Sequence, residues 1–331
     1  MSLVLQPRRG LTIVDLVVSL CVILMLGSTV LTTTCRSRET SNRVKCASNL
    51  RTIGQAILLY ANENRFVYPM ATYDPDTAHA PVAFTGAFAK NLADPDAPLP
   101  NDVTAALFLL VRTQEITPEV FTCPTSSAER WDYSRPDDSE SRKPTAFDRS
   151  NWPSDRFLSY AYVTPYPGRE AVAKGYRLNT SISAEFAVAS DLGPKGDAPL
   201  KVRVNSPRSD MSTANSLNHD RDGQNVLYGD GRVEFQSNVF VGLSQDNIFT
   251  AGDPAASPGP LSASLIGTPA SAGDSILLPH ASYDTLPWNP YKNRPMLRWL
   301  AGVYDNWPKV LAAVVLLGVG LWMARVLLAK D

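Results

Sequence analysis

The sequence has little of what an enzyme or a nucleic-acid-binding protein usually requires. It contains only three histidines and four cysteines in 331 residues. It has no GxSxG, P-loop, GxGxxG or HExxH motif, and no CxxC pair of the kind that holds zinc. Lys and Arg number 31 against 32 for Asp and Glu, so the chain lacks the basic excess that a phosphate backbone attracts. We therefore expect a protein that is not an enzyme and binds no nucleic acid.

Long uncharged runs are also few, and the two that matter lie near the ends of the chain. Residues 16–35 carry no formal charge, and a helix of that length rises about 30 Å, enough to cross the hydrocarbon core of a bilayer. Residues 310–329 are similar, with one arginine near the far end. The sequence thus predicts membrane-spanning helices over 11–35 and 306–331. A buried helix of the globular domain is the alternative for the second.

The segment after the first run is amphipathic. Apolar side chains recur at three- and four-residue steps, which places them on one face of a helix. They are Val44, Ala47, Leu50, Ile53, Ile57, Leu58 and Ala61. We expect the helix to continue over residues 36–65. Because the three threonines at 32–34 weaken a helix, two helices broken near 32–37 are the alternative.

The N-terminus resembles the class III signal of type IV pilins and type II secretion pseudopilins. The resemblance lies in Arg8-Arg9-Gly10-Leu11-Thr12-Ile13-Val14-Asp15, followed by the apolar helix. It implies that prepilin peptidase cleaves after Gly10 and that the new N-terminal residue, Leu11, is methylated. It also implies that Asp15, where the family usually has Glu, pairs with the terminal amine of a neighbouring subunit.

Alternatives to this N-terminal interpretation remain open. A lone acid at a membrane is costly without a partner, which favours the pairing of Asp15, but an acid at the interface could instead contact water. The apolar run also ends in small polar residues before Cys35, which would suit an ordinary secretory signal that is cleaved there.

Two further segments are similar to the large pseudopilin-like proteins of Planctomycetes, which share a motif written H-x9-DG. One is Lys45-Cys46-Ala47-Ser48-Asn49-Leu50-Arg51-Thr52-Ile53-Gly54-Gln55-Ala56, with the later Tyr68-Pro69. The other joins His219 to Asp230-Gly231, although ten residues rather than nine separate them. Since Asp230-Gly231 lies between two β-prone triplets, it predicts a hairpin with a two-residue type I′ turn.

His219, Asp220 and Asp222 form the candidate metal site. The Asp-x-Asp-Gly pattern resembles part of a calcium loop, but the later bidentate Glu of an EF-hand is absent. The alternative is that these side chains cap the turn before the hairpin through hydrogen bonds to the backbone.

Cys46 and Cys123 are the cysteines of the soluble part, since Cys21 and Cys35 belong to the apolar run. If this part is exported, its environment permits a disulfide, and these two residues are the candidate pair. Two separately buried thiols are the alternative.

These observations predict an α+β, pilin-like fold. A long N-terminal α-helix would pack on a small antiparallel β-sheet with loop insertions, followed by a C-terminal transmembrane helix. The expected parts are a leader (1–10), a transmembrane helix (11–35), its amphipathic continuation (36–65), a globular domain (66–250), a flexible Pro/Ala/Ser-rich tail (251–305) and the C-terminal transmembrane helix (306–331).

The resemblance implies a non-enzymatic subunit of a type II secretion or type IV pilus-like system, in the cytoplasmic (inner) membrane with its domain outside the cytoplasm. Expected partners are other pilin or pseudopilin subunits, prepilin peptidase and the inner membrane. No cofactor is expected, apart from calcium if the His219 segment binds a metal. Because a second span would hinder extraction into a filament, a membrane-tethered extracytoplasmic domain that does not polymerise is the alternative.

Overall fold

The computed structural model describes residues 13–76, 81–90, 94–132, 145–252, 265 and 267–281. Within the first helix, α1 (Ile13–Glu63), side chains are described from Leu16 to Ile23 and from Glu39 onward. The chain divides into two compact units, Met1–Pro287 and Trp288–Asp331. All the described residues belong to the first unit.

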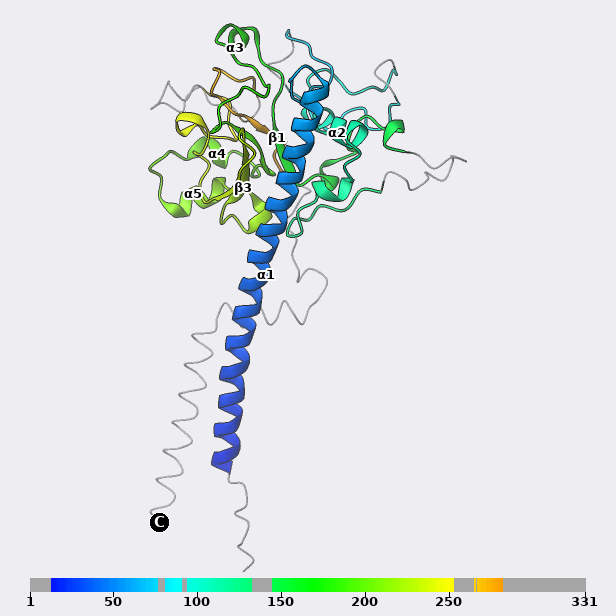
Figure 1. The fold of residues 1–331 in the computed structure, drawn as a ribbon. Helices are drawn as coiled ribbons and strands as arrows, with labels where there is room; N and C mark the ends of the chain where they lie inside the picture. The colour runs from blue at the N-terminus through cyan, green and yellow to red at the C-terminus, as the bar shows by residue number, and fades with distance from the viewer. Residues whose placement is uncertain are drawn as a thin grey trace, which may run out of the picture. The chain divides into compact units, whose positions relative to one another are not determined.

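The centre of the fold is a five-stranded antiparallel sheet with the order β4-β3-β2-β1-β5 (Figure 1). Its strands are β1 (Tyr160–Val163), β2 (Ala187–Asp191), β3 (Gln224–Tyr228), β4 (Val233–Gln236) and β5 (Leu277–Leu278). Every residue of β1, β2 and β3 is buried. Since side chains alternate between the two faces of a sheet, other parts of the chain must cover both faces at these three strands.

Short helices surround the sheet. The α-helices are α2 (Val103–Thr113), α3 (Arg169–Ala173), α4 (Ala198–Lys201) and α5 (Arg208–Ala214). The 3-10 turns are η1 (Pro118–Phe121), η2 (Ala146–Asp148), η3 (Asp155–Phe157), η4 (Leu217–His219) and η5 (Leu243–Gln245). The apolar periodicity of residues 103–113 predicts α2, which is confirmed. It begins there because the carboxylate of Asp102 accepts a hydrogen bond from the Ala105 amide at 3.0 Å.

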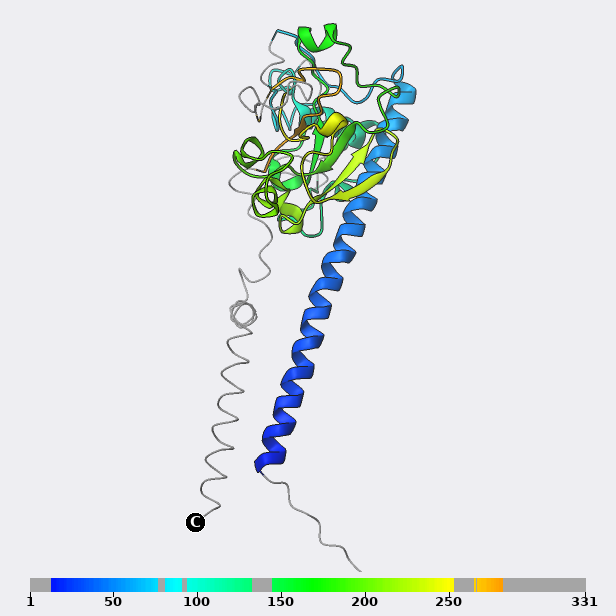
Figure 2. The ribbon, with the colours of Figure 1, turned by 90° about the vertical axis from the view of Figure 1, so that its left-hand side faces the viewer.

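The second half of α1 packs against β2, β3 and β4 (Figure 2). The buried face consists of Cys46, Leu50, Ile53, Ala56, Ile57 and Ala61. Gly54 lets the helix approach β3 closely, because a Cβ there would lie 3.0 Å from a methyl carbon of Leu227. Two apolar residues of the predicted stripe, Val44 and Leu58, are instead exposed on the outer side.

The fold class predicted from the sequence, a pilin-like fold with membrane-spanning helices, is wrong. The described residues form a mixed helix and sheet fold, and none of their helices is both long and apolar enough to cross a membrane. This finding corrects the first predicted membrane span, 11–35, which falls on α1. The predicted amphipathic continuation, 36–65, carries Arg38, Glu39, Arg43 and Lys45 and packs on the sheet as part of the globular unit. The second predicted span, 306–331, lies outside the described residues.

Three local expectations also differ from the structure. The hairpin between β3 and β4 has a three-residue loop, with Tyr228 donating to the Arg232 carbonyl at 2.9 Å, and only Gly231 of the predicted Asp-Gly pair is left-handed, at φ 84°. The β-prone composition of residues 202–204 predicts a short strand, but these residues form none. Leu277 and Leu278, within the tail expected to be flexible, are buried and form β5, because an apolar run there pairs with β1.

Candidate functional site: a buried histidine between α1 and the sheet

His219 lies at the end of η4, in the segment that leads into β3, and its side chain is completely buried. Its Nδ1 lies 2.9 Å from Oε1 of Glu39 on α1. Its Nε2 lies 3.2 Å from Oδ2 of Asp191, the last residue of β2. One imidazole therefore connects the first helix to the centre of the sheet.

The two carboxylates favour the charged form of this imidazole. Burial lowers the pKa of His219, but the charge of Asp191 and hydrogen bonds to Asp191 and Glu39 outweigh that effect and raise the pKa to about 9. At neutral pH both ring nitrogens therefore carry protons and donate. For Glu39, burial raises the pKa, but hydrogen bonds from His219 and Arg43 outweigh burial and lower it. The result is an ion triad in which His219 and Asp191 are fully buried and Glu39 is partly exposed.

Asp191 is held in place by neighbouring strands. Its Oδ2 accepts a hydrogen bond from the Asn225 amide at 2.6 Å and another from the Asn225 side chain at 3.0 Å. The Asn218 side chain donates to the Ser159 carbonyl at 2.7 Å and lies 3.4 Å from Oδ1 of Asp191. A buried carboxylate needs such donors, since it loses its water on folding. These bonds fix the direction in which Asp191 meets the imidazole.

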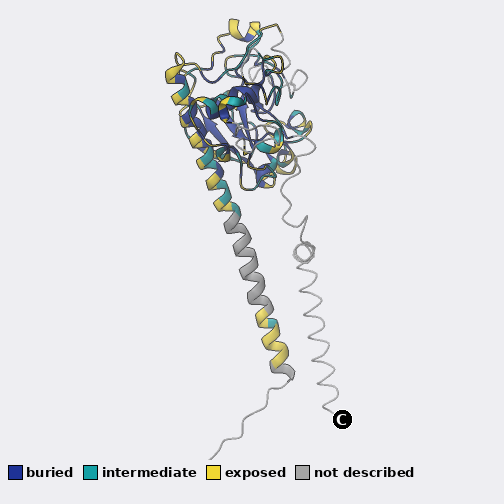
Figure 3. Ribbon diagram, turned by 90° about the vertical axis from the view of Figure 1, so that its right-hand side faces the viewer, coloured by how far each residue is buried: buried dark blue, intermediate teal, exposed yellow. Residues whose placement is uncertain are grey.

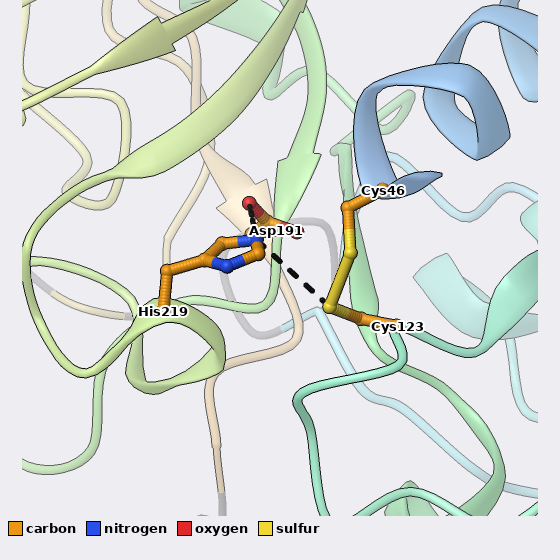
Figure 4. A group of neighbouring side chains, drawn as sticks. All are labelled: Cys46, Cys123, Asp191 and His219. Atoms are coloured by element: carbon orange, nitrogen blue, oxygen red, sulfur yellow. Dashed lines mark hydrogen bonds and ion pairs between the residues drawn. A yellow bond between two sulfur atoms is a disulfide. The ribbon is translucent and has the colours of Figure 1, made fainter. Parts of the chain in front are cut away.

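The Cys46–Cys123 disulfide lies against the same imidazole (Figure 4). Cys46 belongs to the buried face of α1, and Cys123 follows η1. The Cys123 sulfur lies 3.9 Å from Nε2 of His219. The structure thus joins the two cysteines for which the sequence left a disulfide and separate thiols open, and it places their bond beside the ion triad.

Arg43 covers the triad on its outer side. Its guanidinium contacts Glu39 at 3.0 Å and Asp222 at 2.6 Å, and it lies 4.2 Å from the centre of the Phe235 ring on β4. The same ring meets the edge of His219, with centroids 5.8 Å apart. Arg43 therefore ties α1 to the loop before β3 and to β4.

The predicted metal residues do not form one ligand set. His219 is buried within the triad, whereas Asp220 and Asp222 are exposed, and Asp222 is paired with Arg43. Among the described residues, the metal-capable group that includes His219 consists of Cys46, Cys123, Asp191 and His219. Glu39 and Asp191 were missed by sequence reasoning. The only local signal was the Glu39–Arg43 spacing of four residues on a helix.

The other predicted site residues lie elsewhere or outside the description. Asp230 and Gly231 form the turn at the far end of β3 from His219, so the residues of the motif do not share a site. Gly10 and Leu11 lie outside the described residues. Asp15 belongs to α1, but its side chain is not among those described.

Within the triad, the imidazole of His219 and the carboxylate of Asp191 are fully buried, whereas Glu39 is partly exposed beside Arg43. A cavity of 320 Å³ elsewhere in the domain is lined by Tyr68, Tyr73, Tyr176 and their neighbours, and by no residue of the triad. A cavity of only 20 Å³ reaches Asn218 and Ser159. The arrangement therefore anchors α1 rather than exposing a reactive group to solvent.

Comparison of this chain with protein-family models, with curated proteins and with solved structures found no match.

Proposed function

We propose that this chain is a non-enzymatic, pseudopilin-like subunit that assembles with other such subunits through the first part of α1. The proposal rests chiefly on one observation. Six large apolar side chains in the described part of that segment are between 41% and 64% exposed (Figure 3). They are Leu16, Val17, Val18, Leu20, Val22 and Ile23.

The distribution of these side chains favours several partners over one. Successive residues of an α-helix are turned by about 100°, so the six positions cover the whole circumference. A helix that is apolar all round is normally buried on every side. Full burial of one such side chain is worth about 1.5–3 kcal/mol, so covering the exposed parts of all six would contribute on the order of 5 kcal/mol per chain.

The second half of α1 supports the same function because it is anchored in the domain. Cys46 bonds to Cys123, Glu39 pairs with buried His219, and Asn49 donates to the Thr122 carbonyl at 3.1 Å. A force applied to the first half of α1 would therefore reach the sheet without the helix peeling away. A subunit that is held in a polymer by one helix needs this property.

The resemblance of the N-terminus completes the proposal. Cleavage after Gly10 would leave Leu11 as a methylated N-terminus. Asp15, the fifth residue of the cleaved chain, would then supply a carboxylate for the terminal amine of the next subunit. The other subunits and prepilin peptidase are the proposed partners.

The test uses the full-length chain with Cys35→Ser, which leaves Cys21 as the free thiol of the apolar segment. We expect concentration-dependent oligomers in sedimentation velocity, and covalent oligomers when a short bismaleimide links Cys21 of neighbouring chains. Val18→Asp should weaken association more than tenfold, because an unpaired carboxylate in an apolar contact costs several kcal/mol.

Leu59→Asp is the matched control, since Leu59 is an exposed apolar residue of the half of α1 that is packed on the sheet. It should leave the oligomers unchanged. A wild-type chain that stays monomeric at every concentration and gives no Cys21 cross-link would overturn the proposal in favour of a tethered domain that does not polymerise.

A further inference from the structure

We propose that Cys46, Cys123, Asp191 and His219 form a Zn²⁺ site when the disulfide is reduced, so that a disulfide and a zinc ion are alternative occupants of one position. All four residues are buried, and they come from α1, the segment after η1, the end of β2 and the end of η4. One ligand atom from each lies within 4.8 Å of the other three. No other contact in the described residues brings two sulfurs, an imidazole and a carboxylate together in this way.

The donor set matches the preference of zinc. Two thiolates, one imidazole nitrogen and one carboxylate oxygen give a four-coordinate tetrahedral site, with Zn–S near 2.3 Å and Zn–N near 2.0 Å. Such a tetrahedron separates its donor atoms by roughly 3.2–3.8 Å. The Nε2 of His219 is already 3.2 Å from Asp191 and 3.9 Å from the Cys123 sulfur. The two sulfurs must separate after their bond breaks, and any donor pair near the 4.8 Å limit must close by about 1 Å.

The residues around the donors suit a metal site as well. Zinc-bound histidines usually donate their second ring N–H to a carboxylate, which fixes the orientation of the ring. His219 makes that contact through Nδ1 to Glu39 at 2.9 Å, while its Nε2 faces the cysteines and Asp191. Asn225 holds Asp191 through two hydrogen bonds. The ligands are thus oriented before any ion arrives.

The chemistry of the exchange balances with a dithiol reductant. The reductant transfers two electrons and two protons, the S–S bond breaks, two thiols form, and the reductant leaves as its own disulfide. Zn²⁺ then displaces both thiol protons and the proton on Nε2 of His219, so that three protons are released per ion. A disulfide oxidant reverses the process. It accepts two electrons from the thiolates and two protons from solvent and leaves as its own dithiol, while the S–S bond forms and the ion is expelled.

Either occupant closes the same loop between α1 and the segment after η1, 77 residues apart in sequence. A chain that folds under reducing conditions would therefore keep α1 attached to the sheet through zinc. The same chain under oxidising conditions would keep it attached through the disulfide.

The test uses the full-length chain with Cys21→Ser and Cys35→Ser, which leaves Cys46 and Cys123 as its only thiols. The protein is unfolded, reduced with a phosphine and refolded without oxygen, with or without Zn²⁺. We expect one zinc ion per reduced chain after gel filtration and none on the oxidised chain. Co²⁺ in place of Zn²⁺ should give the thiolate charge-transfer band and the intense visible bands of a tetrahedral site.

The zinc affinity of substituted chains distinguishes residues that bind the metal from residues that only lie near it. His219→Gln and Asp191→Asn should each abolish stoichiometric binding, and Glu39→Gln should weaken it about 10- to 100-fold, the usual effect of removing the partner of a metal-bound histidine. Asp222→Asn is the matched control, because this exposed carboxylate lies near the cluster without being a ligand. Its affinity, measured against a chromophoric chelator, should equal that of the parent.

Several results would overturn the proposal. One is a reduced, folded chain that binds no zinc, and another is a cobalt complex without the thiolate band. Unchanged affinity in both ligand variants would count equally against it. If the reduced chain unfolds, added Zn²⁺ should restore the far-ultraviolet circular dichroism of the oxidised protein, and a failure to do so would also reject the site.

Discussion

The imidazole Nδ1 of His219 lies 2.9 Å from Oε1 of Glu39, although the two residues are 180 positions apart in sequence. This contact joins the first helix to the segment that precedes β3, and Asp191 completes it from the opposite side of the ring. Because His219 and Asp191 are buried beside the disulfide, and Arg43 lies against Glu39, the charge state of the triad bears directly on how firmly α1 is held.

The first prediction concerns pH. Since the folded-state pKa of His219 is raised from 6.5 to about 9, the triad stabilises the fold fully below about pH 6.5, and this contribution is lost as the pH rises through 9. The free energy of unfolding should fall by about 3 kcal/mol between pH 6 and pH 10 from this group. Urea unfolding at a series of pH values measures the slope.

His219→Gln is the control for this slope. It removes the titrating group and leaves the other groups that titrate in this interval, so the pH dependence should become shallower by the contribution of His219. Identical slopes for the parent and the variant would show that the imidazole is not held in its charged form.

The second prediction concerns the disulfide. A cross-link that closes a 77-residue loop destabilises the unfolded chain by about 4.5 kcal/mol on the chain-entropy model. Cys46→Ser together with Cys123→Ser should lower the free energy of unfolding by about 2–5 kcal/mol in the absence of zinc. Cys21→Ser, which removes a thiol outside the bond, should have no effect. A double variant as stable as the parent would mean that the bond does not form in solution.

The third prediction concerns the close contact of α1 with β3. Gly54→Ala places a Cβ 3.0 Å from a methyl carbon of buried Leu227, so the helix or the leucine must shift. Overpacking of this kind costs about 1–3 kcal/mol, which outweighs the gain of up to about 1 kcal/mol from alanine in a helix. Thermal unfolding should therefore begin at a lower temperature.

Ser48→Ala provides the comparison, since it introduces alanine at an exposed position of the same helix. It should be neutral or slightly stabilising. If Gly54→Ala behaves in the same way, the separation between α1 and β3 is greater than the structure indicates.

The fourth prediction concerns processing. In a host that contains prepilin peptidase, intact mass spectrometry should detect a chain that begins at N-methylated Leu11. Expression without the peptidase should yield the chain with residues 1–10 retained. A chain that begins near Cys35 or Arg36 would instead identify an ordinary secretory signal.

The fifth prediction concerns Asp15. If its carboxylate pairs with the terminal amine of a neighbour, Asp15→Ala should abolish co-assembly measured by Cys21 cross-linking, while Asp15→Glu, which retains the charge, should preserve it. The domain should unfold at the same temperature in both variants. Normal cross-linking of Asp15→Ala would contradict the proposed pairing.

Local patterns in the sequence were sufficient for some elements and not for others. The apolar periodicity of residues 103–113 lies within one segment, and α2 forms where it predicts. The structure adds the capping carboxylate of Asp102 from the same segment. The apolar stripe on α1 was less well predicted. Periodicity does not say which of two adjacent helix faces meets the sheet, and two residues of the stripe, Val44 and Leu58, are exposed.

The hairpin shows how tertiary contacts override a local signal. Asp-Gly favours a two-residue turn, yet the loop begins one residue earlier, at Gly229. The amide of Gly229 donates to the Phe186 carbonyl at 2.9 Å, and a Cβ there would lie 2.3 Å from the Ser183 carbonyl oxygen. The contacting residue, Phe186, lies 43 positions before Gly229. The sequence around the turn therefore gives no sign of this contact.

The sequence by itself determined where helices and strands could form, because propensity, periodicity and capping act over a few residues. It also determined the residues capable of chemistry, which are few. Only the tertiary structure decided that Cys46 meets Cys123, that His219 turns away from Asp220 and Asp222, and that Glu39 and Asp191 hold it. Those pairings depend on how α1 packs on the sheet. Because a charge removed from water is costly unless it is paired, the imidazole and the carboxylates around it stabilise one another.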